Sequence, residues 1–167
     1  MNDNRRMFED GMNVYTYIVI VLCGVHTLAH GQRLTNEQEV IAETLLGEAR
    51  GEGKGGMYAV ACIIKQRMIN RKQTAQQVCL ARGQFDYWTQ HKRAKWDDQN
   101  RANVRRLMQS DTELVRYAKA LAVSINKLDL NYTKNADHYC TLGTHNYWTK
   151  GKTPVVIVGK HKFYKLR

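Results

Sequence analysis

The stretch that decides the fold is TNEQEVIAETLLGEARGE, residues 35–52. It opens with a capping box, because Thr35 is followed three residues later by Gln38. Apolar residues then recur at helical spacing, with Ile41 and Leu45 as landmarks. The pattern predicts a helix that begins near Thr35 and ends at the glycine-rich segment that starts at Gly51.

Glu48 places a carboxyl group on the apolar stripe of this predicted helix, because it lies seven residues after Ile41 and four after Thr44. A carboxylate that faces a core is costly unless it is paired or protonated. The last turn of a helix also carries the negative end of the helix dipole, and Glu52 adds a like charge one turn further on. These effects all raise a carboxyl pKa. Glu48 is therefore a candidate general acid, and the structural alternative is a salt bridge to a basic side chain such as Arg67.

The rest of the chain predicts helices first and a small sheet late, which is an α+β fold. Residues 84–88 and 132–148 are typical of loops and short strands, and residues 90–103 favour neither a helix nor a strand. The predicted elements are a helix over 57–70, a short helix over 74–80, a helix that begins at Ser110 with Glu113 completing a capping box, and a hairpin of 155–158 and 161–164 that turns at Gly159 and Lys160.

Length and composition are those of one ordinary globular domain. The 167 residues are 43% hydrophobic and 25% charged, which excludes a disordered or collagen-like chain, and four cysteines are too few for a disulfide scaffold. The 26 basic residues outnumber the 15 acidic ones, and the net charge is +11. Such a charge favours a polyanionic partner such as nucleic acid, an anionic wall polymer or a phospholipid surface. Solubility alone is the structural alternative.

The N-terminal segment predicts export. Residues 14–28 read VYTYIVIVLCGVHTL, but the strongly apolar run covers only residues 18–25. That run is short for a membrane span and fits the apolar part of a signal peptide, with a cleavage site before Gln32 or, as a second option, after Ala29. We expect residues 1–31 to be a signal peptide or a signal-anchor that engages the membrane, and residues 32–167 to form the exported domain, in the periplasm, the cell wall or the medium. The alternative is a buried N-terminal helix of a cytosolic protein.

Export would leave three cysteines in an oxidising compartment, where one pair could form a disulfide. Cys62 lies in a stretch typical of a packed helix face. The preferred pair is therefore Cys79 with Cys140.

Four motifs in a fixed order give the chain a family resemblance. The motifs are GEARGE at 47–52 with Gly56, AVA at 59–61 and Arg67; Val78 and Cys79 followed by Gln84 and Phe85; ADHY at 136–139; and GKHKFY at 159–164. The chain resembles the SleB/CwlJ-like cell-wall hydrolases. It departs from their pattern at Gln66, where Asn is usual, over residues 90–111, and over residues 141–148, which replace a proline-rich context.

The resemblance implies an enzyme that cleaves the peptidoglycan glycan backbone between N-acetylmuramic acid and N-acetylglucosamine, with Glu48 as the catalytic acid. It implies a fold like that of lysozyme and the lytic transglycosylases, in which a helical core and a small β-subdomain flank a cleft. No metal or cofactor is expected, and the protein is expected to be a monomer. Spore-cortex, wall-remodelling and phage-lysin roles all remain open.

A single carboxyl group suffices for cleavage if the muramic acid C6 hydroxyl attacks its own anomeric carbon, as in lytic transglycosylases. Hydrolysis instead asks for a second carboxylate, for which Glu52, Asp86 and Asp137 are candidates. The predicted substrate-binding residues are Glu52, Gln84, Phe85, His138 and Tyr139. The structural alternatives are support of Glu48 or an ion pair with Arg50 for Glu52, a turn with a core aromatic for Gln84 and Phe85, and a hydrogen-bonded structural histidine for His138.

Other classes of function have weaker support. A zinc site at His138, Cys140 and His145 lacks the usual ligand spacing. A Cys–His enzyme lacks a recognisable motif around any cysteine. A nucleic-acid-binding module fits the charge but shows no binding motif, so no nucleic-acid partner is expected. A wall-binding protein without activity is the alternative closest to the enzyme.

Overall fold

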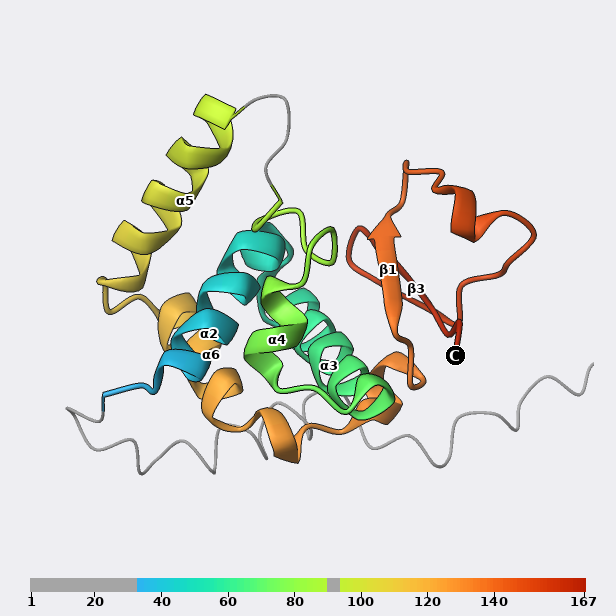
Figure 1. The fold of residues 1–167 in the computed structure, drawn as a ribbon, viewed down its shortest axis with the longest axis horizontal. Helices are drawn as coiled ribbons and strands as arrows, with labels where there is room; N and C mark the ends of the chain where they lie inside the picture. Colours follow the sequence, from blue (N-terminus) through green and yellow to red (C-terminus); the bar gives the residue numbers. More distant parts are fainter. Residues whose placement is uncertain (1–32, 90–93) are drawn as a thin grey trace, which may run out of the picture. The chain divides into compact units, whose positions relative to one another are not determined.

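A computed structural model describes residues 33–89 and 94–167 of the chain (Figure 1), with the side chains of residues 94–96 left out. The predicted signal peptide or signal-anchor lies outside the described residues. Over the ranges that are described, none of the helices has the length and apolar character needed to cross a membrane.

The described residues form helices followed by a small sheet. The α-helices are α2 (Asn36–Ala49), α3 (Gly53–Arg71), α4 (Ala75–Leu80), α5 (Ala94–Met108) and α6 (Glu113–Val123). Short 3₁₀ turns are η1 (Arg50–Glu52), η2 (Ile125–Lys127), η3 (Leu130–Thr133) and η4 (Tyr147–Thr149). The strands are β1 (His138–Thr141), β2 (Val156–Val158) and β3 (His161–Tyr164).

Helix α2 begins as the sequence predicts. The Thr35 side chain accepts a hydrogen bond from the Gln38 backbone, and the Gln38 side chain accepts one from the Thr35 backbone, so the capping box is confirmed. The predicted apolar stripe is buried and includes Ile41, Thr44 and Leu45. This stripe packs α2 against α3, α4 and α6.

Helix α3 begins at Gly53, so the prediction of a start near Met57 was wrong. Gly55 and Gly56 belong to its first turn instead of separating two helices. The reason lies at Gly56, where a Cβ would come within 2.3 Å of the Glu52 Cβ, so only glycine fits in this turn. Every residue from 56 to 64 is buried, and α3 is therefore the central helix of the fold.

Two later helices differ from expectation. Helix α6 is capped by Thr112, whose side chain accepts a hydrogen bond from the Val115 backbone, so the capping box predicted at Ser110 and Glu113 was wrong. Helix α5 occupies the stretch for which the sequence favoured neither a helix nor a strand. The short helix α4 has the predicted position, with a capping box at Thr74 and Gln77.

The predicted hairpin is present and forms part of a three-stranded antiparallel sheet in the order β1-β3-β2. Phe163 of β3 lies opposite Tyr139 of β1 and Val156 of β2. Phe163 is fully buried in a cluster with Ala59 and Ile63 of α3, which joins the sheet to the helices. Figure 1 shows the sheet beside the helical part of the chain. The α+β class is thus confirmed.

The predicted disulfide is absent. Cys79 and Cys140 are both free, buried thiols, as is Cys62. Cys79 belongs to α4 in the helical part, whereas Cys140 belongs to β1, where its Sγ lies 4.0 Å from the Thr144 carbonyl oxygen. Burial raises the pKa of both the Cys62 and Cys79 thiols to about 12, so both stay protonated at neutral pH.

Candidate active site

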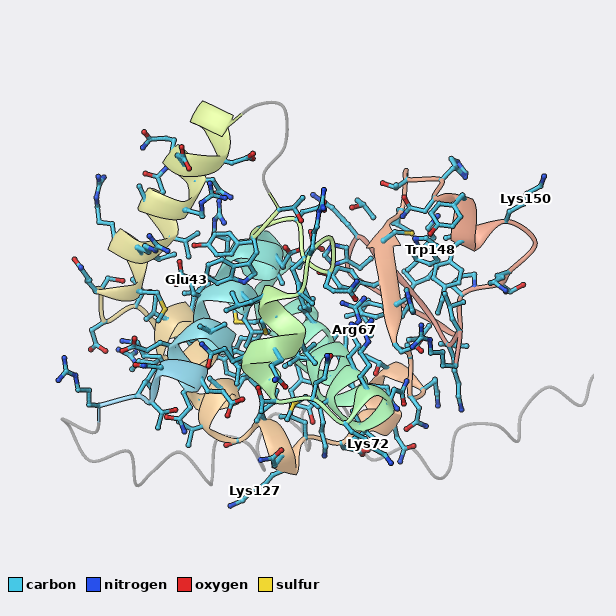
Figure 2. The ribbon with its side chains drawn as sticks, in the orientation of Figure 1. Glu43, Arg67, Lys72, Lys127, Trp148 and Lys150 are labelled. Atoms are coloured by element: carbon cyan, nitrogen blue, oxygen red, sulfur yellow. The ribbon has the colours of Figure 1, made fainter. Side chains whose placement is uncertain are left out.

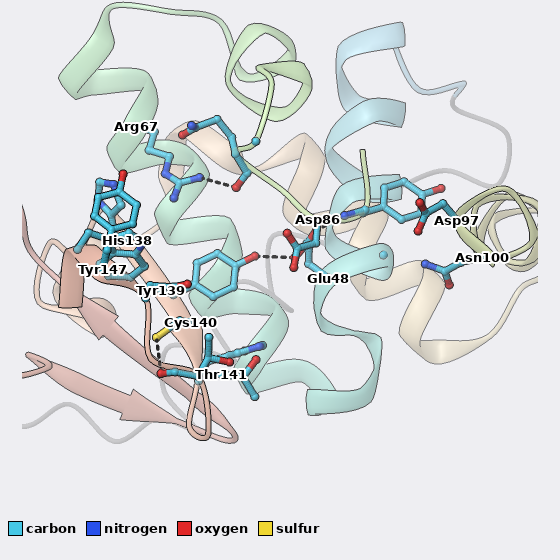
Figure 3. Close-up of a pocket in the computed structure, with 18 residues that line it drawn as sticks. Glu48, Arg67, Asp86, Asp97, Asn100, His138, Tyr139, Cys140, Thr141 and Tyr147 are labelled. Carbon is cyan, nitrogen blue, oxygen red and sulfur yellow. Dashed lines mark hydrogen bonds between the residues drawn. The ribbon is translucent and has the colours of Figure 1, made fainter. Parts of the chain in front are cut away.

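A pocket of about 660 Å³ lies between the helical part and the sheet. Figure 3 shows one wall made by Glu48, Asp86, Asp97 and Asn100, and an opposite wall that carries residues of β1 and η4. The walls come from segments far apart in the sequence, because the first wall uses α2, the loop after α4, and α5. The residues of the opposite wall are His138, Tyr139, Cys140, Thr141, Thr144, Asn146, Tyr147, Trp148 and His161.

Glu48 stands in the last turn of α2 and holds hydrogen bonds from both walls. Its Oε1 accepts a hydrogen bond of 2.6 Å from the Tyr87 backbone N–H, and its Oε2 accepts one of 2.8 Å from the Tyr139 hydroxyl. The second bond is drawn in Figure 3. The carboxyl group is therefore fixed in orientation, with the Oε2 edge turned toward the sheet.

Gly47 explains how the Tyr87 backbone reaches Glu48. A Cβ on Gly47 would lie 2.3 Å from atoms of the Tyr87 ring, so only glycine lets this ring pack so closely against α2. The same loop is tied to α2 by Trp88, whose indole N–H donates to the Thr44 hydroxyl at 2.8 Å. Gly47 of the Gly-Glu-Ala motif thus lets Tyr87 pack close to α2, and this position allows the Tyr87 backbone N–H to donate to Glu48.

The pKa of Glu48 is raised, as the sequence predicts. Burial is the main cause, and the charge of Asp86 acts in the same direction. The hydrogen bonds from Tyr87 and Tyr139 and the charge of Arg67 lower the pKa but do not outweigh burial. The like charge comes from Asp86 instead of Glu52. A carboxyl group of this kind keeps its proton to higher pH than an ordinary glutamate, as a general acid requires.

The alternative of a salt bridge between Glu48 and Arg67 is not found. Arg67 is 5% exposed and donates to the backbone carbonyls of Asp137 at 2.8 Å and Gln84 at 3.2 Å. Its guanidinium also lies over the Phe85 ring, 5.1 Å from the centroid. Arg67 therefore holds the wall of the pocket together and leaves the Glu48 carboxyl group to its two hydrogen bonds.

Tyr139 lines the pocket and also contacts both Glu48 and the sheet. Its ring stacks on Phe163 with 5.8 Å between the centroids, and its hydroxyl donates to Glu48. Desolvation and the nearby Glu48 raise the pKa of Tyr139 well above its usual value, so the hydroxyl keeps its proton. Tyr139 is thus placed to orient the Glu48 carboxyl group.

Replacing Tyr139 by phenylalanine is expected to raise the pKa of Glu48 further, because a hydrogen bond that favours the charged form is lost. The stacking ring is kept, so the fold should not change. Titration of the Glu48 side-chain carboxyl by carbon NMR measures this shift directly. A pKa that stays the same or falls in Tyr139→Phe would show that the hydroxyl does not stabilise the carboxylate.

Two more predicted residues line the pocket. Gln84 faces it while its Oε1 accepts a hydrogen bond of 2.6 Å from Arg71. His138 also lines it, with Nδ1 2.9 Å from Asp137 Oδ1 and its ring 5.3 Å from that of Trp148. Both side chains are already partly engaged by the protein, and both remain candidates for substrate contact.

Phe85 and Glu52 lie outside the pocket. Phe85 is 2% exposed and packs against Arg67 and Tyr139, so its ring has no free face for a sugar. Glu52 points to the turn between β2 and β3, where its Oε2 accepts a hydrogen bond of 2.8 Å from the Lys160 backbone N–H. Both residues therefore make contacts within the fold, and neither lines the pocket.

Sequence reasoning missed several residues of the pocket wall, among them Asp97, Asn100 and Tyr147. Asp97 and Asn100 come from α5, and Tyr147 comes from η4. Tyr147 lines the pocket although 93% of it is exposed, so its ring is open to a bound molecule. The signal for Tyr147 was the aromatic pair it forms with Trp148 in a polar loop. No sequence pattern marks Asp97 or Asn100.

Of the three candidates for a second carboxylate, Asp86 alone lines the pocket. Asp137 is 2% exposed and its oxygens accept from the Leu166 backbone and the Asn70 side chain. Glu52 is engaged at the hairpin. Among the described residues, no group of three or more His, Cys, Asp or Glu side chains is arranged to hold a metal ion.

A family model described as Cell Wall Hydrolase (Hydrolase_2) matches residues 51–164. The match includes most of the pocket wall, with Asp86, Tyr87 and Tyr139, and it begins just after Glu48. Neither a curated protein nor a solved structure matches the chain.

Proposed function

Because this chain belongs to the cell wall hydrolase family, whose members act on peptidoglycan, we propose that it cuts the glycan backbone between N-acetylmuramic acid and N-acetylglucosamine. The observation that carries the proposal is the Glu48 carboxyl group, which has a raised pKa and two fixed hydrogen bonds at a 660 Å³ pocket. A pocket of this size accommodates sugar units of a strand.

In the first step, protonated Glu48 donates its proton to the glycosidic oxygen that links C1 of N-acetylmuramic acid to the next sugar. The C1–O bond breaks, the N-acetylglucosamine unit leaves with a hydroxyl group, and positive charge develops at C1 and the ring oxygen. The Tyr87 N–H holds Oε1, so the transferable proton resides on the Oε2 edge beside Tyr139. The carboxylate that remains is stabilised by the same two donors.

In the second step, the Glu48 carboxylate takes the proton of the C6 hydroxyl of the same muramic acid. The C6 oxygen forms a bond to C1 and yields a 1,6-anhydro ring, which restores the protonated acid. One carboxyl group therefore serves as acid and then as base, and no second acid is needed. This is the route of the lytic transglycosylases. The pocket between helices and a small sheet agrees with the proposed likeness to lysozyme-like enzymes.

Hydrolysis is the second candidate function. It is supported by Asp86, a second carboxylate that lines the pocket. Asp86 is exposed, and its charge acts on Glu48. In this route the Asp86 carboxylate takes a proton from water while the water oxygen attacks C1. The product then carries a free reducing end instead of an anhydro ring.

Digestion of purified peptidoglycan by the full chain in ¹⁸O-labelled water separates the two routes. The proposal expects fragments that end in 1,6-anhydro-N-acetylmuramic acid and carry no label. Labelled N-acetylmuramic acid ends would replace the transglycosylase route by hydrolysis. Labelled N-acetylglucosamine ends would show that a different bond is cut and would contradict the proposed specificity.

Tyr147 is expected to contribute to binding more than to catalysis. Its exposed ring can cover about 50 Å² of apolar sugar surface, which corresponds to about 1.3 kcal/mol. Replacing Tyr147 by alanine should therefore raise KM about tenfold and leave kcat within about twofold. Steady-state kinetics on soluble glycan strands checks this, with Ile157→Ala as the control, because Ile157 is exposed on β2 outside the pocket. A tenfold loss in kcat with KM unchanged would contradict it.

Members of this family are typically exported to the cell wall. We propose that residues 1–31 direct the export of this chain. Expression of the full chain in a bacterium, followed by N-terminal sequencing of the exported protein, tests the leader. A start at Gln32 supports a cleaved signal peptide. An intact N-terminus in the membrane fraction supports a signal-anchor, and an intact soluble cytosolic protein contradicts export.

A further inference from the structure

The C-terminal segment 138–167 has a one-sided charge. It contains six basic residues and none of the 15 acidic residues of the chain. The basic residues are Lys150, Lys152, Lys160, Lys162, Lys165 and Arg167. This segment comprises the sheet and its loops and is called the β-subdomain below.

Most of these charges face solvent and have no acidic partner. Lys150, Lys152, Lys160, Lys165 and Arg167 are all exposed. Figure 2 shows Lys150 extending outward from the loop after η4. The Lys and Arg ion pairs found among the described residues all lie in the helical part, for example Lys54 with Glu113 and Arg105 with Glu43. Lys162 donates only to the Thr144 carbonyl oxygen at 3.2 Å.

The charged segment is also one wall of the pocket. Residues of β1 and η4 line the cavity, and Lys162 lies opposite the pocket residue Cys140 in the sheet register. Burial lowers the pKa of the Arg71 guanidinium, and the like charge of Arg167 lowers it further, whereas the charge of Asp137 acts in the opposite direction. None of the six basic residues lines the pocket itself, and two carboxylates, Glu52 and Asp137, lie against the segment. The segment still has more basic than acidic side chains, so a strand that leaves the pocket along this wall meets excess positive charge.

Unbalanced positive charge is relieved by an anionic partner, and the strength of the attraction depends on ionic strength. The glycan strand of peptidoglycan carries such a partner, because each muramic acid bears a stem peptide that is rich in carboxylates. We propose that the β-subdomain binds the stem-peptide carboxylates of a strand held in the pocket, so the enzyme selects peptide-bearing strands over bare glycan. This inference rests on the proposed function for the identity of the strand.

The test uses the full chain with Lys150, Lys152, Lys160 and Lys165 all replaced by glutamine. The matched control replaces Arg33, Arg82, Arg106 and Lys127, which are equally exposed but lie outside the β-subdomain, and so removes the same charge. Two soluble, fluorescently labelled probes are compared by anisotropy: glycan strands with stem peptides, and the same strands stripped of peptides by an amidase. Cleavage of both strands is measured in parallel.

We expect the wild type to bind peptide-bearing strands about tenfold more tightly than stripped strands at 50 mM salt, and to lose this preference at 500 mM salt. The β-subdomain variant should bind both strands equally and cleave stripped strands at the wild-type rate, and the control should keep the preference. Equal binding of both strands by the wild type, or an equal loss of preference in the control, would overturn the proposal. Binding preference without any cleavage would uphold it while the proposed enzymatic function fails.

Discussion

Replacing Glu48 by glutamine is expected to lower the rate of glycan cleavage about 10³-fold, because the amide cannot transfer a proton to the glycosidic oxygen. The substitution keeps the shape of the side chain, and the amide oxygen can still accept the Tyr87 N–H. The matched control is Glu52→Gln, which changes the same group at a site outside the pocket. The control should cleave at a rate within about threefold of wild type. Equal losses in the two variants would contradict a catalytic role specific to Glu48.

Glu48→Gln is also expected to change the free energy of unfolding, in a direction that depends on pH. Burial raises the folded-state pKa of Glu48, so the folded protein holds this proton more tightly than the unfolded chain does. The wild type is therefore destabilised as pH rises from the ordinary glutamate pKa through the raised value. Glutamine does not ionise, so Glu48→Gln should be at least as stable as wild type at neutral pH. Urea denaturation at pH 4 and pH 7.5 checks that its inactivity does not come from unfolding.

Replacing Arg67 by methionine is expected to destabilise the fold by about 3 kcal/mol, because one buried and one partly buried carbonyl group lose their charged donor. Those carbonyls belong to Asp137, which leads into β1, and Gln84, which lies in the pocket loop. The guanidinium also lies over Phe85. The loss should lower the thermal midpoint by about 10 °C for a domain of this size.

Arg71→Met is the matched control for this prediction, since Arg71 lies one turn further along α3 and is more exposed. Its side chain donates to one side-chain acceptor, Gln84 Oε1. We expect a loss of about 1 kcal/mol or less. Thermal or urea unfolding measures both variants. A loss below about 1 kcal/mol in Arg67→Met would show that Arg67 does not hold the sheet and the pocket loop together.

The sequence predicted those features of the fold that depend on residues close together in the chain. The capping box at Thr35, the short helix α4 and the spacing of Glu48 on an apolar stripe each depend on residues within one or two helical turns. For the same reason, the raised pKa of Glu48 could be inferred before its surroundings were known. The hairpin around Gly159 also follows from adjacent residues.

Features that depend on contacts between residues far apart in the sequence could not be predicted from it. Tyr139 reaches Glu48 across 91 residues of sequence, and no spacing rule connects them. Glu52 was expected near Glu48 because it lies four residues, about one helical turn, further along the chain. Helix α2 instead ends at Ala49, the next three residues form a 3₁₀ turn, and Gly53 takes a φ of 67°, so Glu52 turns toward the hairpin. Phe85 was expected to contact a sugar, but the sequence motif alone does not show that its ring is buried.

The most direct test of the account is the release of soluble fragments from purified peptidoglycan by the wild-type chain, Glu48→Gln and Glu52→Gln, analysed by mass spectrometry. All three proteins are first shown to be folded by circular dichroism. The account predicts glycan fragments from the wild type and Glu52→Gln, and none above background from Glu48→Gln. Release of the same fragments by Glu48→Gln at a rate near that of wild type would contradict the assignment of Glu48 as the catalytic acid.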